Sequence, residues 1–579
     1  MSEKFGGSPD NQKTVLEHPV GLFVLFFTEM WERFSYYGMR ALLVLFLTSS
    51  LIDDGWAWDR ADALKLYGYY TGLVYLTPIF GGIIADKLLG YRNSVTLGAL
   101  IMTIGHASMA WETSTTFYIG LGCLIVGNGL FKPNISSMVG QLYGDGSMKK
   151  DSAYTIFYMG INAGAFLGIL LCGYIGEKVG WSYGFGLAGV FMFFGMLQFW
   201  FAQKIFGKIG LSPAALNLAN KDNKEVEVID TTPAHIVRDR IIVIGVLAFF
   251  TIFFWMAFEQ AGGSMTIFAG DYTDRILEGT SATVFFWMNF LLTVVPLGIV
   301  TWVLFSLFKQ IFAKYALSNL FLGASFVIIW GIAFWMLAKD FNTKTYEVQI
   351  ANEAATSVLR IDEDLADGAS IFVRVNPKKN LKLVSSEQAQ KYTDKKSATI
   401  VRQKTNELEV PASWFGILNS FFIIAFAPLF SRIWEAKPNI SGPIKFAIGL
   451  ILLGLGFAAL AYGSMGIEQG AKTASVSMMW LIVAYLLHTL GELCVSPVGL
   501  SYVSKLAPAK LVGFMFGIWF VANFIANTLA GLSGSYIDHI TETYSLSTFF
   551  LIFTFVPIAA GLILVVLNPM LKRMMHGVK

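Results

Sequence analysis

Charge is scarce in this sequence. Only 14% of its 579 residues are Asp, Glu, Lys or Arg, whereas soluble proteins carry about a quarter. The three cysteines, Cys123, Cys172 and Cys494, lie in apolar segments without paired metal-ligand spacing, which favours small buried side chains over metal or redox chemistry. We also find no phosphate-cradling loop, Ser/His/Asp set or nucleic-acid module. We therefore expect neither a soluble protein nor an enzyme, and no cofactor, metal or nucleic-acid partner.

Long hydrophobic runs take the place of charge. Hydrophobic residues make up 55% of the chain, and many apolar stretches exceed the roughly 20 residues that cross a bilayer. Backbone polar groups in lipid must be satisfied internally, so such segments form helices or a closed barrel. The runs are continuous rather than alternating, which indicates helices. We predict an all-α integral membrane protein with about fourteen transmembrane helices.

Lysine and arginine are concentrated in alternate connections between these runs. Lys87, Lys204 and Lys572 lie in basic connections, whereas Asp53 and Asp271 lie in connections poor in basic residues. The positive-inside rule then places both termini in the cytoplasm. The polar N-terminus lacks the layout of a cleavable signal, so we expect the first helix to act as an uncleaved insertion signal.

The predicted helices are interrupted by two polar stretches. One is expected to be a cytoplasmic linker between two helix bundles. The other contains β-like runs such as SIFVRVN and is expected to form a small extracytoplasmic cap or hairpin. The predicted segments are an N-terminal six-helix bundle (15–207), the linker (208–238), a seventh helix (239–270), an extra helix pair (281–338), the extracytoplasmic segment (340–411) and five final helices (412–570).

A weak internal repeat relates the two halves. KPNISS at 132–137 resembles SPVGLS at 496–501, and each places a proline inside a predicted membrane helix. Matching halves are common in transporters, whose substrate site lies between them near the bilayer midplane. The repeat puts Lys132 and Glu492 on corresponding helices.

The first hydrophobic helix carries an unusual polar stripe. Charges in a membrane helix cost several kcal/mol each unless they face a partner or water, so they indicate function. We interpret the stripe as part of a substrate and proton path. The alternative is a salt-bridge network that only locks helices together. Its members fall on one helical face: Glu29, Glu32, Arg33, Tyr36, Tyr37 and Arg40.

Three further charged residues lie inside apolar runs. Lys132 needs a carboxylate partner or an anionic ligand there, unless it reaches the cytoplasmic interface. Glu259 and Glu492 are candidate proton carriers, because intramembrane carboxylates mark proton relays. Ser496 shares a helical face with Glu492. The alternative for each carboxylate is a static hydrogen bond between helices.

Several of these blocks resemble a known family. ExxERFxYYG at 29–38, GLFKPN at 129–134, FEQAGGS at 258–264 and GELCVSPVGLS at 491–501 are similar, in the same order, to blocks of the proton-dependent oligopeptide transporters. That family belongs to the major facilitator superfamily. The resemblance implies two six-helix bundles that rock around a central cavity, plus an inserted helix pair.

The resemblance also implies a role for each matching position. Glu29, Glu32 and Arg33 would couple protons and, with Lys132, bind the peptide carboxylate. Glu492 would receive the peptide amino terminus. A proton-sensitive gate toward the outside would consist of Arg40 and Glu259. The remaining cavity-lining residues would be Tyr36, Tyr37, Tyr75, Asn162, Asn419, Ser496 and Trp519.

The sequence departs from the family pattern in three places. Bacterial relatives usually insert the extra helix pair between the sixth and seventh core helices, whereas here it follows the seventh. The polar segment 340–411 is unusual, and Asn419 is followed by Ser420 where the family commonly has proline. These departures leave the predicted core set of site residues intact.

We therefore expect a proton-coupled symporter of di- and tripeptides that acts as a monomer in a bacterial inner (plasma) membrane. One alternative keeps the fold and transports nitrate or another small anion. Another is a membrane receptor or binding protein that does not transport and uses segment 340–411. A membrane-embedded hydrolase has the least support.

Overall fold

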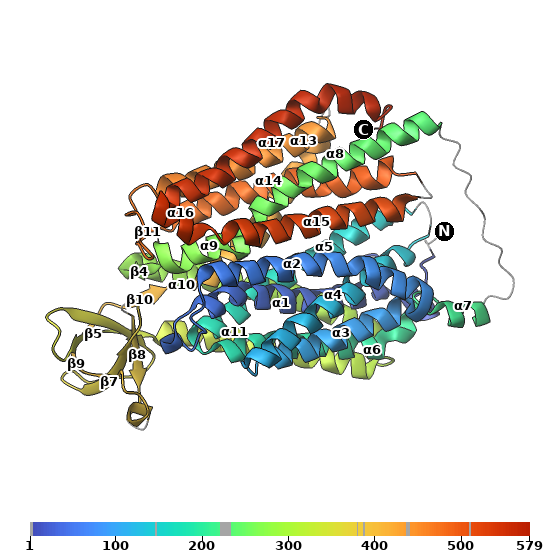
Figure 1. Ribbon diagram of the computed structural model, residues 1–579. Coiled ribbons are helices and arrows are strands. Elements are labelled where there is room, and N and C mark those ends of the chain that lie inside the picture. The colour runs from blue at the N-terminus through green and yellow to red at the C-terminus, as the bar shows by residue number, and fades with distance from the viewer. Residues whose placement is uncertain are drawn as a thin grey trace.

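In the computed structural model the long helices lie side by side, and a small β domain projects from one end (Figure 1). The structure describes residues 4–144, 147–219, 233–378, 380–385, 388–435, 440–508 and 511–578. The long helices are α1 (Val20–Thr48), α2 (Arg60–Ile84), α3 (Gly90–Met109), α4 (Ser114–Gln141), α5 (Lys149–Lys178), α6 (Trp181–Ala202), α8 (Ala234–Phe258), α10 (Gly279–Ile311), α11 (Ala316–Asn342), α12 (Ile417–Glu435), α13 (Gly442–Gly463), α14 (Met479–Leu506), α15 (Val512–Gly534) and α17 (Leu546–Met574).

These helices have the length and composition of membrane spans. Among the described residues, twelve stretches are long and apolar enough to cross a bilayer. One of them, Arg60–Met109, contains both α2 and α3, which are joined by the π-helical turn η3 (Ala85–Leu89). Helix α1, with 29 residues, is also long enough to cross a bilayer, and its charged stripe distinguishes it from these apolar stretches. The predicted multi-pass helical membrane fold is confirmed, and the helix count agrees with the expected number.

The helices form two bundles of six. Helices α1–α6 pack together as the N-terminal bundle, and α8, α12–α15 and α17 as the C-terminal bundle. The bundles meet where α2 packs on α15 and where α5 packs on α12. A side chain at Gly531 of α15 would overlap the backbone of Gly68 in α2. This glycine pair therefore lets the two bundles approach closely.

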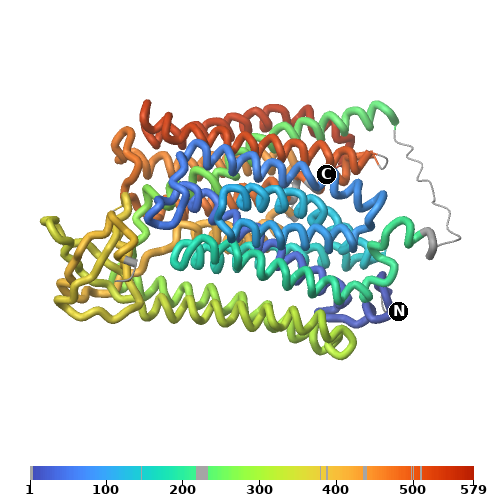
Figure 2. The backbone as a smooth tube through the Cα atoms, turned by 60° about the horizontal axis from the view of Figure 1, so that its bottom comes forward, coloured from blue at the N-terminus to red at the C-terminus, as the bar shows by residue number. Residues whose placement is uncertain are grey.

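The extra helix pair packs against the N-terminal bundle, although it follows α8 in the chain. Helices α10 and α11 run along the outside of the helical body, with α11 beside α6 (Figure 2). Phe326 of α11 makes edge contacts with Phe27 and Trp31 of α1, at ring-centre distances of 5.7 and 5.6 Å. Ser318 Oγ donates to the Gln198 carbonyl of α6 at 2.8 Å.

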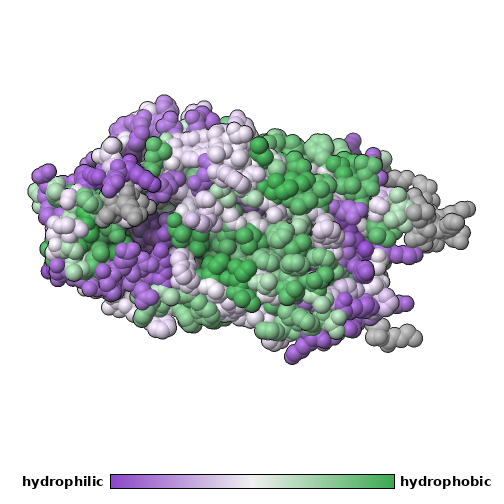
Figure 3. Space-filling model, turned by 90° about the horizontal axis from the view of Figure 1, so that it is seen from below, coloured by the Kyte–Doolittle hydropathy of each residue, from purple (hydrophilic) through white to green (hydrophobic). Residues whose placement is uncertain are grey.

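The outer face of this helical body is apolar. In the view of Figure 3, hydrophobic side chains cover the middle of the molecule, and hydrophilic ones gather at both ends. Helix α10 contributes large side chains more than half exposed in the isolated chain, as expected for contact with lipid. They are Trp287, Leu291, Ile299, Trp302 and Phe305.

The segment between α11 and α12 folds as a β domain. Five antiparallel strands are ordered β6-β5-β9-β7-β8 and enclose a core of Tyr346, Val348, Leu359, Val373 and Ile400. Alternation of apolar and polar residues at the start of SATIVRQ places Ala398 and Ile400 in this core. The strands are β5 (Lys344–Ile350), β6 (Thr356–Ile361), β7 (Ser370–Val375), β8 (Leu381–Val384) and β9 (Lys396–Lys404).

Short elements complete the fold. The strands outside the domain are β1 (Thr14–Val15), β2 (His18–Pro19), β3 (Thr273–Asp274), β4 (Ile276–Glu278), β10 (Glu407–Glu409) and β11 (Val476–Ser477). The short helices include η2 (Leu51–Asp53), α7 (Pro213–Ala219), η5 (Glu259–Gly262), α9 (Ser264–Ile267), η6 (Phe268–Tyr272), η8 (Ala412–Gly416) and α16 (Ile537–Thr543).

Both termini lie at the end of the helical body opposite the β domain (Figure 1). Helix α7, in the predicted linker, lies at that same end, while residues 220–232 of the linker fall outside the described residues. We call this the terminal end and the other the β-domain end. Placement of the terminal end in the cytoplasm remains a prediction.

Candidate functional site

A cavity of about 650 Å³ lies between the two bundles. Helices α1, α2, α4 and α5 provide one wall, and α8, α12, α14 and α15 provide the other. Because each bundle supplies half of the lining, any rocking of one bundle against the other changes the access to the cavity. The predicted residues that line it are Glu29, Arg33, Tyr37, Arg40, Tyr75, Lys132, Asn162, Glu259, Asn419, Glu492, Ser496 and Trp519.

The α1 stripe forms a buried ion cluster at one side of the cavity. Arg33 Nε lies 3.1 Å from Glu29 Oε1 and also pairs with Glu32. Asn128 of α4 donates to Glu32 Oε1 at 3.0 Å. All three charged side chains are at most 4% exposed. The cluster joins α1 to α4 and presents Glu29 and Arg33 to the cavity.

Two predicted residues lie behind the cavity surface. Glu32 is fully buried between Arg33 and Asn128. Tyr36 is buried against Tyr37, with ring centres 5.1 Å apart. Helical spacing puts both residues on the stripe but cannot say which members face the cavity.

The same wall holds an unpaired cation. Lys132 Nζ lies 4.5 Å from the centre of the Tyr75 ring, and no carboxylate of the described residues lies within ion-pair distance. Arg33 Nη2 and Glu29 Oε2 are buried without a hydrogen-bond partner in the described part of the chain. The Arg33 donor and the Lys132 ammonium both favour an anionic ligand, such as a carboxylate, whereas Glu29 Oε2 is an acceptor and needs a donor or a proton.

The opposite wall carries a carboxylate. Glu492 of α14 accepts a hydrogen bond from Asn419 Nδ2 of α12 at 2.8 Å, and the same amide contacts Thr489 Oγ1 at 3.2 Å. Ser496 lies one turn further along α14 and also lines the cavity. The cavity therefore has cations on the N-terminal bundle and an acidic acceptor on the C-terminal bundle.

The remaining predicted lining residues are neutral. Asn162 of α5 donates to the Tyr158 carbonyl at 3.0 Å, which holds its side chain along the helix. Trp519 of α15 packs over Gly499 of α14, where any larger residue would displace the indole. These side chains give the cavity flat apolar and amide surfaces.

An ion pair joins the two bundles on the β-domain side of the cavity. Arg40 of α1 pairs with Glu259 of η5 and donates through Nε to Tyr67 Oη of α2 at 2.8 Å. The Arg40 and Glu259 side chains are 11% and 2% exposed. We call these three residues the inner row. The inner row joins α1 and α2 to the C-terminal bundle on the β-domain side of the cavity.

A second set of ion pairs lies nearer the β domain. Arg60 of α2 contacts Asp271 of η6 at 2.5 Å and Asp538 of α16 at 2.8 Å. Sequence reasoning missed these pairs, because Arg60 and Asp271 stand at helix ends, where charges are ordinarily solvated. Sequence reasoning also missed lining side chains that resemble lipid-facing ones, namely Tyr158, Trp255, Phe258 and Tyr485. The isolated polar residues His488 and Asn523 line the cavity as well.

The described residues contain no group of three or more His, Cys, Asp or Glu side chains that could hold a metal ion. Cys123, Cys172 and Cys494 are free cysteines.

Comparisons with known proteins agree with this geometry. The model of the POT family matches residues 92–224 and 387–552. The chain is 33% identical to the uncharacterized transporter YclF of Bacillus subtilis (strain 168), over 98% of this chain and 97% of that protein. It is 29% identical to the peptide transporter YePEPT of Yersinia enterocolitica, with the same two coverages.

Solved structures give the same result. A crystal structure of a peptide transporter POT in complex with sulfate is similar with a TM-score of 0.67 and 26% identity, and the match covers 100% of this chain and 98% of that one. A related structure of such a transporter contains alafosfalin. The family model covers more than half of the chain and the relatives match it end to end, so this protein belongs to the POT family of proton-dependent oligopeptide transporters.

Proposed function

We propose that the protein is a proton-coupled symporter that imports di- and tripeptides by alternating access. The observation that carries the proposal is the charge arrangement of the cavity. Arg33 and Lys132 offer free cationic donors on one wall, and Glu492 offers an acceptor on the other. A peptide zwitterion has a carboxylate at one end and an ammonium at the other, so the two walls together match its fixed ends.

The names of relatives agree with this proposal. Several are described as di-/tripeptide transporters, among them a Lactococcus lactis protein 28% identical to this chain over 98% of its length. The aromatic and amide side chains of the cavity would contact the peptide through uncharged groups. Such groups impose no charge on the ligand, so the cavity can accept variable peptide side chains. Tyr37, Tyr75, Asn162, Asn419 and Trp519 are the proposed contacts, and Ser496 adds a hydroxyl.

We assign proton coupling to the carboxylates in and beside the cavity. Glu29, Glu32 and Glu259 are buried there, and Glu492 is a half-buried lining residue, so protonation of any of them would remove a charge from an enclosed site. Protonation of Glu259 would break its ion pair with Arg40 and loosen the contact between the bundles. That step would link a proton on Glu259 to opening of the cavity toward the β-domain end.

Proteoliposome uptake tests the proposal. A labelled dipeptide should accumulate under an inwardly directed proton gradient, and a proton ionophore should abolish accumulation while exchange across the membrane persists. Intact peptide recovered from the vesicles would exclude hydrolysis. Absence of both uptake and exchange, with protein that is monodisperse and binds the dipeptide, would leave a receptor rather than a transporter.

Orientation and cargo are parts of the same proposal. We place the terminal end in the cytoplasm of a bacterial cell, the β domain outside the inner membrane, and the functional unit in a single chain. A nitrate carrier fits the site less well, because Glu492 would repel an anion in a cavity that Arg33 and Lys132 share with it. Competition of nitrate against dipeptide uptake distinguishes the two cargoes.

A further inference from the structure

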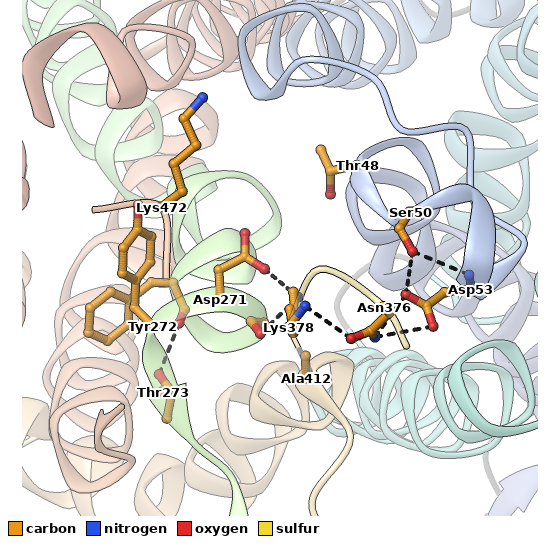
Figure 4. Close-up of polar contacts among 12 residues, drawn as sticks. Thr48, Ser50, Asp53, Asp271, Tyr272, Thr273, Asn376, Lys378, Ala412 and Lys472 are labelled. Atoms are coloured by element: carbon orange, nitrogen blue, oxygen red, sulfur yellow. Dashed lines mark hydrogen bonds and ion pairs between the residues drawn. The ribbon is translucent and has the colours of Figure 1, made fainter. Parts of the chain in front are cut away.

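The turn between β7 and β8 reaches from the β domain to the gap between the two bundles. Figure 4 shows Asn376 and Lys378 on this turn, with Asn376 beside Asp53 and Lys378 beside Asp271. Asp53 follows α1 in the N-terminal bundle, and Asp271 belongs to the C-terminal bundle. A single turn of a domain outside both bundles therefore contacts both.

The β domain is fastened to the N-terminal bundle. Asn376 Nδ2 donates to Asp53 at 3.1 and 3.3 Å. Lys382 Nζ, on β8, lies 2.6 Å from Asp54 Oδ2. At the base of the domain, Glu409 of β10 lies 2.9 Å from Lys178 Nζ of α5.

The charge at this base is stable over a wide pH range. Glu409 also lies 3.0 Å from Arg275 Nη2. Burial alone would raise the pKa of Glu409, but the charges of Lys178 and Arg275 outweigh that effect and hold the pKa well below its usual range. Helix α11, which leads into the domain, adds a hydrogen bond at 2.6 Å from Tyr174 Oη of α5 to Asp340 Oδ1. The domain should therefore move with the N-terminal bundle.

Lys378 makes the contact that crosses to the other bundle. Its ammonium pairs with Asp271 Oδ1 and donates to the Gly270 carbonyl at 3.1 Å. Asp271 is held in the C-terminal bundle by Ala474, whose backbone N–H donates to the Asp271 carbonyl at 3.1 Å. The other carboxylate oxygen of Asp271 accepts from Arg60. Asp271 thus binds two cations, and both are supplied by parts of the chain fixed to the N-terminal bundle.

We propose that the β domain supplies a gate residue, Lys378, which latches the cavity shut on the β-domain side. This inference rests on the proposed alternating-access function. Opening toward the β-domain end separates η2 of the N-terminal bundle from η6 of the C-terminal bundle. Lys378 is carried by a turn tied to Asp53, so it must then release Asp271. The latch stabilises the closed state and leaves the open state without that contact.

The same hairpin offers a matched control. Lys382 and Lys378 are similarly exposed, at 45% and 41%, and each pairs with one aspartate. The partner of Lys382 is Asp54, which belongs to the N-terminal bundle together with the domain's other anchors. Rocking of the bundles leaves that pair intact. Only the Lys378 pair should influence opening.

External labelling of a cavity cysteine measures opening without any substrate. Ala41 lines the cavity next to Arg40, so Ala41→Cys reports access from outside when Cys123, Cys172 and Cys494 are replaced by alanine. A membrane-impermeant methanethiosulfonate is applied to intact cells. An exposed pair contributes up to about 1 kcal/mol, so Lys378→Ala should raise the labelling rate about two- to fivefold. Lys382→Ala should leave the rate unchanged.

Reversible crosslinking gives a second readout. A short bifunctional methanethiosulfonate should join Lys378→Cys to Asp271→Cys, stop dipeptide uptake and suppress labelling of Ala41→Cys, and a reductant should restore both. The control pair Lys382→Cys and Asp54→Cys should crosslink without either effect. Equal labelling rates in Lys378→Ala and Lys382→Ala, or continued opening in the crosslinked Lys378–Asp271 pair, would overturn the latch. Failure of uptake in the parent protein with latch-dependent labelling intact would instead overturn the proposed function.

Discussion

Recognition of the peptide amino terminus by Glu492 gives a prediction that binding alone can test. The perturbation is paired: Glu492→Gln in the protein and acetylation of the amino group in a dipeptide. Glu492 Oε2 is already occupied by Asn419 Nδ2 at 2.8 Å. Glu492 lines the cavity, and its other carboxylate oxygen has no hydrogen bond to any described residue, so we expect it to accept from an ammonium group.

The expected loss of affinity follows from the ion pair between Glu492 and the peptide amino group that each change removes. Truncating one partner of a buried, hydrogen-bonded charge pair costs about 2–5 kcal/mol, which is about 30- to 4000-fold in Kd. Glu492→Gln keeps the shape of the side chain, and Asn419 can reorient its amide to satisfy the new one. Most of the penalty should therefore reflect the lost ion pair rather than a damaged cavity.

Titration calorimetry on purified protein measures the four affinities of this double-mutant cycle. Acetylation should weaken dipeptide binding to the parent protein by at least about 30-fold and binding to Glu492→Gln by much less. Asn527→Ala in α15, a buried side chain outside the cavity lining, serves as a control for nonspecific loss. An acetylation penalty that is equal in the parent and in Glu492→Gln would refute the assignment of Glu492 to the amino terminus.

Three further predictions concern the closed state and the β domain. Glu259→Ala leaves Arg40 buried without its partner, at a cost of about 3–5 kcal/mol to the closed state, so external labelling of Ala41→Cys should rise more than tenfold; an unchanged rate would remove Glu259 from the gate. Gly531→Leu forces α15 away from Gly68, so it should also raise labelling, whereas the neighbouring Leu532→Ala should not. The pKa of Glu409 in the folded protein lies below its usual value of 4.5, so its stabilising contribution is complete above that value and is lost only as pH falls toward the folded-state pKa. Limited proteolysis of the β domain should therefore proceed alike at pH 7 and pH 5, and faster cleavage at pH 5 would contradict the pairing.

The stripe on α1 illustrates what the sequence predicts well. In a membrane helix of 29 residues, charges that share one helical face must point into the protein, because lipid excludes them from a lipid-facing position. Glu29, Arg33 and Arg40 do lie on the cavity side, Lys132 lies on the same wall in α4, and Glu492 lies on the opposite wall in α14. The physical cause is the high cost of an unpaired charge in an apolar setting, which ties a residue type to a location.

The sequence shows no sign of that cost where prediction failed. Arg60, Asp271 and Lys378 stand at helix ends or in a turn, where charges are ordinarily solvated, although the side chains of Arg60 and Asp271 are only 11% and 14% exposed. Nothing in the local sequence distinguishes such residues from ordinary surface charges. Packing of α10 and α11 on the N-terminal bundle was equally hidden, because an apolar helix in lipid has no preferred neighbour that hydropathy reveals.

The inner row and the pair between Lys378 and Asp271 differ in strength, and that difference suits a gate. The inner row is buried, so breaking the pair between Arg40 and Glu259 without neutralising it would strand a charge. A proton on Glu259 removes that obstacle, which makes the inner row the natural point of coupling. The pair between Lys378 and Asp271 is partly exposed and breaks at little cost. It can shift the balance between closed and open states several-fold without stopping the cycle, and this is the kind of adjustment that a domain outside the twelve-helix core can add.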